Sequence, residues 1–418
     1  MEDVYVIGIG MTRFDKHLDR SVKGLAAEAL NKVLADAGIT KDAIEAAYFS
    51  NSMWGYHAEQ HCIRGQVALR DSMIMGIPIY NLENACGGGA TAFHSAWMGV
   101  TSGVYECALA LGAEKLYSED KAKAFRAYWS GIDVENMEAY MVQLRDVSNG
   151  LNLDIPVKDD SEGAGKNRSA AMDIYSTLTR WHMDKYGTTQ RQLAVIASKN
   201  HFHSTMNPNA QFQKDMSVDE ILAARLVSWP LTVPMCAPVG DGAAAAIVCS
   251  ADYLKKVVSP RPVRIRASVM GSGTDRDIVE DHQDISARVS QKAYEISGVS
   301  PDDIDVAELH DATAFGELQH SEAVGFCPPG EGGLFAESGA TKLGGRLPIN
   351  PSGGLESRGH PLGASGLGQI HEIVTQLRHE AGPRQVKNCR IGLAENGGGL
   401  IGFEGAALGI HILERLER

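Results

Sequence analysis

Short apolar runs and helical patterns alternate along the first part of the chain, and this alternation is the main clue to the fold. Residues 4–9 form an apolar run typical of a buried strand, and residues 22–37 follow an amphipathic helical pattern that ends at Gly38. The alternation continues through strand-like segments at 47–50, 77–82 and 107–112, with helical segments at 64–75 and from Gly87 to about 100. Strands that alternate with helices predict an α/β fold with a parallel, doubly wound sheet.

Residues from about 115 to 185 interrupt this alternation. They are polar and mixed in pattern, and Pro156 and the glycines within 163–165 break them further. We expect an inserted loop domain here. The helical pattern returns at 173–186 and 189–204, and the segment 233–250 closes the first half of the chain.

A second alternation of strands and helices follows residue 255. Its predicted elements are strand 262–268, helix 285–297, strand 306–309, helices 316–325 and 364–377, and strand 389–394. A chain of 418 residues also exceeds one ordinary hydrophobic core. We therefore predict two similar βα halves, 1–255 and 256–418.

Composition narrows the classes of function. The formal net charge of −13 argues against nucleic-acid binding, and it means that a site for an anionic ligand has to be locally basic. The seven cysteines form no Cys-x-x-Cys pair, so we predict no metal site and reduced thiols in a cytoplasmic protein. No apolar run approaches the length of a membrane span, and the N-terminus has no basic signal-type region.

Cys86 is the first candidate for chemistry. It lies in a glycine-rich turn between the apolar run 77–82 and the helical pattern that starts at Gly87. Peptide N–H groups at a helix start favour a thiolate, so this position predicts a nucleophile. A buried, inert cysteine is the alternative interpretation of the same turn.

Two histidines in the second half favour the nucleophile. His360 lies between Gly359 and Pro361, in a loop too rich in glycine and proline for a helix or strand. His310 ends the apolar strand 306–309. One cysteine with two loop histidines suits a thiol activated by one imidazole and an oxyanion held by the other.

At these residues the chain resembles the thiolase superfamily, nearly from end to end. Residues 84–86 (Asn-Ala-Cys) resemble the nucleophile loop, and residues 350–366 resemble the Gly-His-Pro signature. The run His310-Asp311-Ala312-Thr313 is similar to the His-Asp-Cys-Phe box of sterol-carrier-protein-type thiolases, and residues 236–245 resemble the Asp-Gly-Ala-Ala-Ala strand entry of the family.

The resemblance implies a fold and a mechanism. The fold would be a layered α-β-α-β-α core of two pseudo-symmetric halves, with a loop domain over the substrate and a homodimer packed through the first half. The chain would cleave a β-ketoacyl-CoA with free CoA as co-substrate and without a tightly bound cofactor. Cys86 would carry the acyl group, His360 would move protons, His310 would stabilise the enolate, and Gly397 and Gly398 would line the cavity beside the thioester.

One departure from the family pattern concerns proton transfer. Most thiolases carry a second cysteine near the C-terminus, but the matching stretch 393–399 contains none, and Glu395 and Asn396 occupy it instead. Glu395 could act as the acid if desolvation raised its pKa from about 4.3 towards neutrality, and the alternative is that His360 or a water makes both transfers. Lys166 and Arg168 are candidates for the basic patch that holds the CoA phosphates.

The substrate and the partners follow only from the overall resemblance. As a whole the chain is similar to 2-benzoylsuccinyl-CoA thiolases, which implies cleavage to benzoyl-CoA and succinyl-CoA. The alternatives are a biosynthetic acetoacetyl-CoA thiolase, a condensing acyltransferase, and a catalytically inert acyl-CoA- or lipid-binding scaffold. Thiolases of this lineage also imply a small zinc-ribbon/OB-fold partner subunit.

Overall fold

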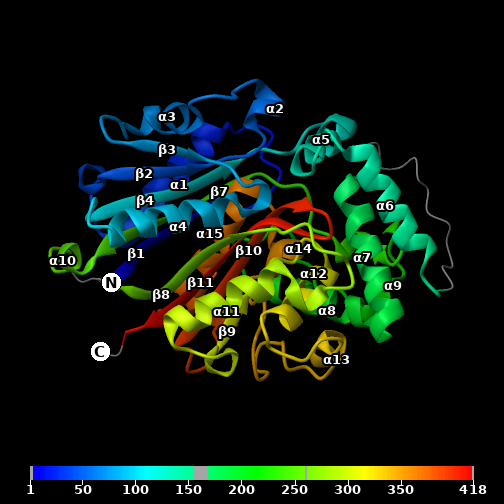
Figure 1. Cartoon of the computed structure of the whole chain (residues 1–418). Helices are drawn as coiled ribbons and strands as arrows, with labels where there is room; N and C mark the ends of the chain where they lie inside the picture. Colours follow the sequence, from blue (N-terminus) through cyan, green and yellow to red (C-terminus); the bar gives the residue numbers. More distant parts are fainter. Residues whose placement is uncertain (1–2, 154–167, 259–260, 417–418) are drawn as a thin grey trace.

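The computed structural model describes residues 3–153, 168–258 and 261–416, which form a large mixed sheet with helices on both sides (Figure 1). The sheet has nine strands in the order β3-β2-β4-β7-β1-β8-β11-β10-β9. Their bounds are β1 Val4–Met11, β2 Ala46–Ser50, β3 Ile79–Leu82, β4 Cys107–Glu114, β7 Gly242–Ser250, β8 Val263–Ser272, β9 Val306–Glu308, β10 Ile391–Ile401 and β11 Glu404–Arg415.

The prediction of a parallel sheet is wrong. Only the pairs β2–β3, β2–β4 and β9–β10 run parallel, and the others are antiparallel. Strand β7 returns beside β4 after the long insertion, and β10 and β11 form a hairpin whose turn includes Gly402 at a φ of 55°. A hairpin joins neighbours that run in opposite directions, whereas parallel neighbours need a crossover.

The helices form layers on and between the strands. Helix α1 (Val22–Ala37) packs on the outer face of the first strands, and α11 (Ile285–Ser297) packs on the last strands. Helices α4 (Gly88–Thr101) and α15 (Leu362–Leu377) lie between the two parts of the sheet, and each contacts strands of both (Figure 1). This arrangement confirms the predicted α-β-α-β-α layering.

Local signals explain the ends of several helices. The Ser21 side chain accepts the N–H of Gly24 at the start of α1, and Gly38 ends the helix at a φ of 67°. Outside the insertion, the other α-helices of the described residues are α2 Trp54–Ala58, α3 Arg64–Leu69, α10 Ala251–Leu254, α12 Ala314–Ala323, α13 Gly332–Glu337 and α14 Gly354–Arg358.

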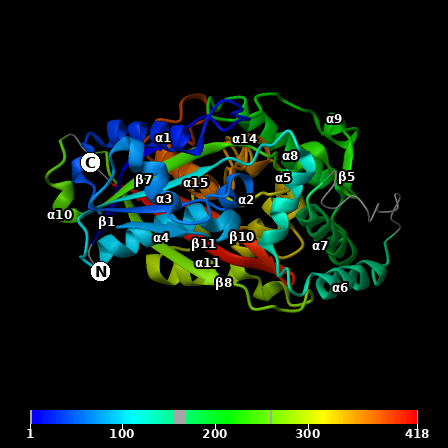
Figure 2. The ribbon, with the colours of Figure 1, turned by 90° about the horizontal axis from the view of Figure 1, so that it is seen from above.

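The insertion lies at one end of the sheet and is mainly helical (Figures 1 and 2). The predicted limit at 185 falls inside α7, and two further helices and a pair of short strands follow before β7. A shared apolar cluster that includes Ile174 and Leu193 packs these helices together. The elements are α5 Lys121–Ala127, α6 Met137–Asn149, α7 Ala170–Tyr186, α8 Gln190–Ser204, α9 Val218–Leu222, β5 Leu226–Ser228 and β6 Leu231–Thr232.

The division of the chain at residue 255 stays a prediction. In the sheet, the strands on either side of it meet through β1 and β8, where the paired residues are Tyr5 with Arg264 and Val6 with Val263. Among the described helices, none combines the length and the apolar character that crossing a membrane requires.

Candidate active site

Cys86 sits in a tight turn between a strand and a helix. Strand β3 ends at Leu82, a turn of 3-10 helix covers Ala85–Gly87, and α4 begins at Gly88. Ala85 has a φ of 47°, a left-handed conformation that L-residues rarely adopt. The Ser52 hydroxyl donates to the Ala85 carbonyl at 2.9 Å, so the neighbouring loop holds this strained turn in place.

A glycine in β10 makes room for the turn. A Cβ atom at residue 398 would lie 2.8 Å from the amide nitrogen of Cys86, and closer still to backbone atoms of Asn84 and Gly87. Only glycine allows this approach. The predicted strand ends at residue 394, before these glycines. In the structure β10 runs to Ile401, so Gly397 and Gly398 lie within the strand.

His360 reaches the site from the loop between α14 and α15. Gly359 has a φ of 108°, and Pro361 immediately precedes α15. The Nδ1 atom of His360 lies 2.7 Å from the Ser365 hydroxyl oxygen. Its Nε2 atom is buried and has no hydrogen-bond partner among the described residues.

His310 reaches the same place from the end of β9. Its Nδ1 atom lies 3.0 Å from the side-chain Nδ2 of Asn396, an amide nitrogen that can only donate. Nδ1 therefore accepts, and the ring proton sits on Nε2. The backbone N–H of His310 donates to Glu395 at 2.7 Å, so two neighbouring residues of β10 orient this histidine.

The structure brings the three predicted groups together. The Cys86 sulfur and a ring nitrogen of each of His310 and His360 all lie within 4.8 Å of one another. The two imidazole rings are 5.4 Å apart between centroids and nearly perpendicular, at 81°. Residues as distant in the sequence as 86 and 360 thus form one cluster.

This cluster opens into a large cavity with mostly apolar walls. The cavity has a volume of about 760 Å³, and the insertion supplies much of its wall. The walls include Met53 from the first half and, from the insertion, Phe125, Tyr128, Met172, Tyr175, Leu178, Met216 and Val227. Such a space suits a bulky apolar group placed against the thiol.

The electrostatics of the cluster differ from the prediction for Cys86. Burial, with the carboxylates of Glu83 and Glu114, raises the pKa of the Cys86 thiol to about 12. The expected stabilisation of a thiolate at the helix start is therefore wrong, because desolvation of the thiolate is the larger effect. The resting group is a thiol, and it needs a base to become a nucleophile.

Both histidines are neutral at neutral pH. Burial lowers the pKa of His310 to about 4. Burial, together with the neighbouring His310 and Arg358, lowers the pKa of His360 well below its usual value. A neutral imidazole can accept a proton at one nitrogen and donate at the other, so the pair can serve as base and hydrogen-bond donor.

The structure contradicts the condition under which Glu395 would be an acid. Burial alone would raise its pKa, but His320, 3.0 Å from one carboxylate oxygen, and His310 lower it below the usual value. The same oxygen accepts the Ser286 hydroxyl, and the other accepts the His310 N–H. Glu395 is an ionised carboxylate that positions His310.

The predicted CoA-binding residues have different outcomes. Gly397 and Gly398 line the cavity, as does Arg168, which is buried and forms an ion pair with Asp173 at 2.7 Å. Lys166 lies outside the described residues.

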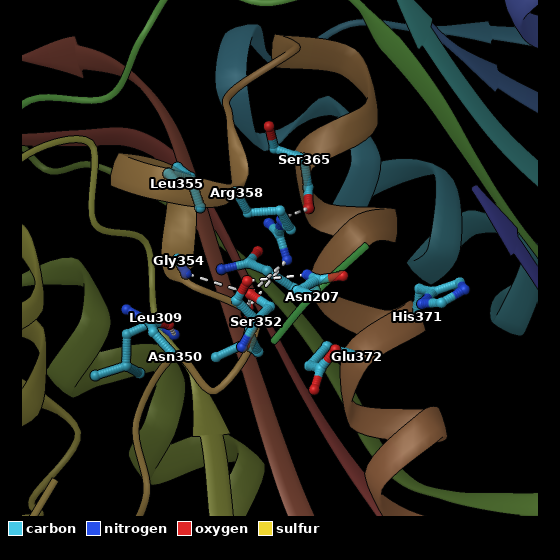
Figure 3. Close-up of polar contacts among 12 residues, drawn as sticks. Asn207, Leu309, Asn350, Ser352, Gly354, Leu355, Arg358, Ser365, His371 and Glu372 are labelled. Carbon is cyan, nitrogen blue, oxygen red and sulfur yellow. Dashed lines mark hydrogen bonds and ion pairs between the residues drawn. The ribbon is translucent and has the colours of Figure 1, made fainter. Parts of the chain in front are cut away.

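A buried polar network behind His360 was not predicted from the sequence. Arg358 is fully buried and pairs with Glu308 at 3.0 Å. Figure 3 shows Arg358 between Ser352 and Ser365, with hydrogen bonds to the Ser352 hydroxyl and to the Ser365 carbonyl. The only hint of this network in the sequence is the presence of polar residues in the glycine-rich segment 350–366, and the sequence does not show which residues they contact.

The Asp311 carboxylate accepts the backbone N–H groups of Leu355 and Glu356. Its carboxylate therefore ties the His310 segment to α14, the helix that leads to His360. The position of the His310 loop thus depends on the position of the His360 loop.

Comparison with known proteins places both parts of the chain in one family. The family model "Thiolase, N-terminal domain" matches residues 4–252, and "Thiolase C-terminal domain-like" matches residues 274–413. Solved structures share the fold. An "Ltp2-ChsH2(DUF35) aldolase" aligns with a TM-score of 0.77 at 23% identity over 99% of this chain and 98% of that one. Human mitochondrial 3-ketoacyl-CoA thiolase aligns with a TM-score of 0.68 at 16% identity over 100% and 99%.

Curated relatives are similar over most of their length. Sterol carrier protein 2 of Bos taurus is 38% identical over 97% of this chain and 71% of its own. The benzoylsuccinyl-CoA thiolase subunit BbsB of Thauera aromatica is 34% identical over 92% and 91%, and an acetyl-CoA acetyltransferase of Methanothermobacter thermautotrophicus is 34% identical over 99% and 100%. With its fold, its family matches and these relatives, the chain belongs to the thiolase family and is an acyltransferase.

Proposed function

We propose that this chain cleaves a β-ketoacyl-CoA with free CoA through an acyl group on Cys86. The observation that carries the proposal is the cluster of one thiol and two neutral imidazoles within 4.8 Å at the end of an apolar cavity. A thiol beside an imidazole is the usual arrangement for covalent acyl transfer.

The first half of the reaction follows from this geometry. His360 accepts the proton of the Cys86 thiol, and the sulfur attacks the β-keto carbon of the substrate. The bond between the α and β carbons then breaks, which leaves the acyl group on Cys86 and an enolate of the shorter acyl-CoA. The Nε2–H of His310 donates to the enolate oxygen, where a preorganised donor contributes about 10²–10³ in rate.

His360 also completes the proton transfers in this proposal. Glu395 is ionised and hydrogen-bonded on both oxygens, and the stretch 393–399 contains no cysteine. The proton that His360 took from Cys86 passes to the enolate carbon. His360 then takes the proton of the incoming CoA thiol, and the CoA sulfur attacks the acyl carbon. The bond to Cys86 breaks, and His360 returns the proton to the Cys86 sulfur, which restores the thiol.

For the substrate we propose 2-benzoylsuccinyl-CoA, cleaved to benzoyl-CoA and succinyl-CoA. The relative named benzoylsuccinyl-CoA thiolase subunit supports this choice, and so do the volume and the aromatic walls of the cavity. Acetoacetyl-CoA is the second candidate, because a relative is named acetyl-CoA acetyltransferase. An acetyl group would leave most of a cavity of about 760 Å³ unfilled.

The partners and the CoA contacts are also proposals. Strand β3 is the last strand at one end of the sheet, and it exposes Tyr80, which supports a homodimer formed through the first half. The complex named in the aldolase structure contains a DUF35 component, which supports a small partner subunit for this chain. Arg168, Gly397 and Gly398 would contact CoA, and a cytoplasmic location stays a prediction.

The test is a cleavage assay with mass analysis of the protein. The chain, with any co-purifying partner, is mixed with 2-benzoylsuccinyl-CoA or acetoacetyl-CoA, first without and then with free CoA. We expect a benzoyl adduct on the Cys86 peptide that CoA removes. Cys236→Ala is the matched control, because Cys236 lines the same cavity and its thiol pKa is also raised by burial.

The variants His310→Ala and His360→Ala should each slow turnover by about 10²–10⁴. An adduct confined to another cysteine would refute the role of Cys86. Binding of acyl-CoA without any cleavage would favour the inert scaffold.

A further inference from the structure

The hydrogen bonds of Ser365 bear on which nitrogen of His360 carries the proton. Ser365 lies in the first turn of α15, five residues after His360. Its hydroxyl donates to the Pro361 carbonyl at 2.9 Å, and its oxygen is 2.7 Å from Nδ1 of His360. A carbonyl can only accept, so the single hydroxyl proton is directed to Pro361.

We infer that Ser365 is a positioning residue that holds His360 in the tautomer protonated on Nδ1. With its own proton on the Pro361 carbonyl, the Ser365 oxygen accepts from Nδ1–H. The lone pair of Nε2 then faces the cluster with Cys86, where Nε2 has no other partner among the described residues. The inference rests on the proposed function, in which His360 is the base.

The neighbouring histidine is held in the opposite state. Asn396 donates to Nδ1 of His310, which leaves the proton of His310 on Nε2. Two neutral imidazoles 5.4 Å apart thus present different atoms to one space: a proton from His310 and a lone pair from His360. One polar neighbour on each ring is enough to give identical side chains separate roles.

The position of Ser365 is itself fixed by the buried network. Arg358 donates to the Ser365 carbonyl at 3.4 Å (Figure 3). It also donates to the Glu308 carboxylate at 3.0 Å. Both Arg358 and Glu308 are fully buried, so this ion pair helps to hold the backbone of Ser365, the residue whose hydroxyl lies beside Nδ1 of His360.

Loss of the hydroxyl would leave the ring free to carry its proton on either nitrogen. Only the molecules with a lone pair on Nε2 could then deprotonate Cys86. A complete change to the wrong tautomer can lower the rate by about 10⁴. Without Ser365 the His360 ring would populate both tautomers, which lowers the rate by less, so we expect Ser365→Ala to lower kcat by about 10- to 100-fold. KM should change little, because the hydroxyl is directed at His360 and not into the cavity.

The experiment measures the reaction of Cys86 with iodoacetamide across pH, followed by mass, in the full chain with any co-purified partner. Ser365→Ala should slow alkylation near neutral pH towards the rate of His360→Ala, and Ser365→Thr, which restores a hydroxyl, should recover it. Thr375→Ala is the matched control, since the Thr375 hydroxyl donates to the backbone carbonyl of His371, four residues back in α15, at 2.7 Å, and within the described residues it bonds to no imidazole nitrogen.

A wild-type rate and pH profile in Ser365→Ala would overturn the inference. So would an equal loss in Thr375→Ala, or no recovery in Ser365→Thr while both proteins melt like wild type. Alkylation needs no CoA substrate. If the wild type fails to cleave β-ketoacyl-CoA, the proposed function fails by itself, while this assay still reports on Ser365.

Discussion

Two adjacent glycines of β10 should respond very differently to the addition of one methyl group. At residue 398 a Cβ would lie 2.8 Å from the amide nitrogen of Cys86, and real Cβ contacts under 3.0 Å are essentially never seen. The atoms it would meet belong to the backbone of the nucleophile turn, which cannot rotate away. At residue 397 the nearest atom is a methyl carbon of Leu408 at 3.6 Å, an ordinary contact.

The size of the effect follows from these distances. Ordinary contact starts at about 3.4 Å, so in Gly398→Ala the turn has to retreat by roughly 1 Å. Overpacking of this kind costs about 1–3 kcal/mol of stability. A displacement of about 1 Å at a reacting group can also cost about 10² in rate. Gly397→Ala should stay within about 1 kcal/mol of the wild-type free energy of unfolding.

The assay compares the two variants for thermal unfolding and for acylation of Cys86 in a single turnover. We expect Gly398→Ala to unfold several degrees earlier and to acylate about 100-fold more slowly, whereas Gly397→Ala should unfold at a temperature close to that of the wild type. Equal thermal unfolding of the two variants would refute the claim that β10 shapes the turn that carries Cys86.

Three further predictions concern charge. Glu395→Gln should destabilise the fold most between about pH 4.5 and 6.5, where Glu395 is ionised and His320 is protonated. At lower pH Glu395 becomes protonated, and at higher pH His320 loses its proton, so the ion pair is lost in both directions. Urea unfolding across pH measures the effect, and a difference in unfolding free energy that does not change with pH would contradict it. Arg358→Met should lower the free energy of unfolding by about 3–5 kcal/mol, since it leaves the buried Glu308 carboxylate without its ion-pair partner. The double variant with Glu308→Gln should recover part of this loss in the same assay. Alkylation of Cys86 in His360→Ala should keep rising with pH and show no plateau below about pH 10, as the thiol pKa of about 12 requires; a plateau near neutral pH would mean that another base acts.

Much of the fold could be predicted because its signals are local. Helix α1 matched the predicted range 22–37, since a serine cap and a left-handed glycine mark its two ends. Strand direction could not be predicted in the same way. All nine residues of β7 are buried, and an apolar run of this kind indicates burial on both faces without showing which way the strand runs.

The candidate site divides along a similar line. Motifs located Cys86, His310 and His360, because each lies in a distinctive loop of its own. They could not predict the charge state of Glu395, whose partner His320 lies on α12, or the thiol pKa of Cys86, which depends on its burial. Contacts between distant segments decide both quantities, and no spacing in the sequence reports them.

The residues of the cluster and the walls of the cavity come from different parts of the fold, so substitutions can change one without the other. Cys86 and His360 lie just before α4 and α15, which are held between both parts of the sheet, whereas much of the cavity wall comes from the insertion between β4 and β7. Substitutions in the insertion can reshape the acyl space while the reacting groups keep their geometry. If the proposed function holds, the acyl group that this chain accepts can therefore be changed through the insertion alone, without altering the three residues of the cluster.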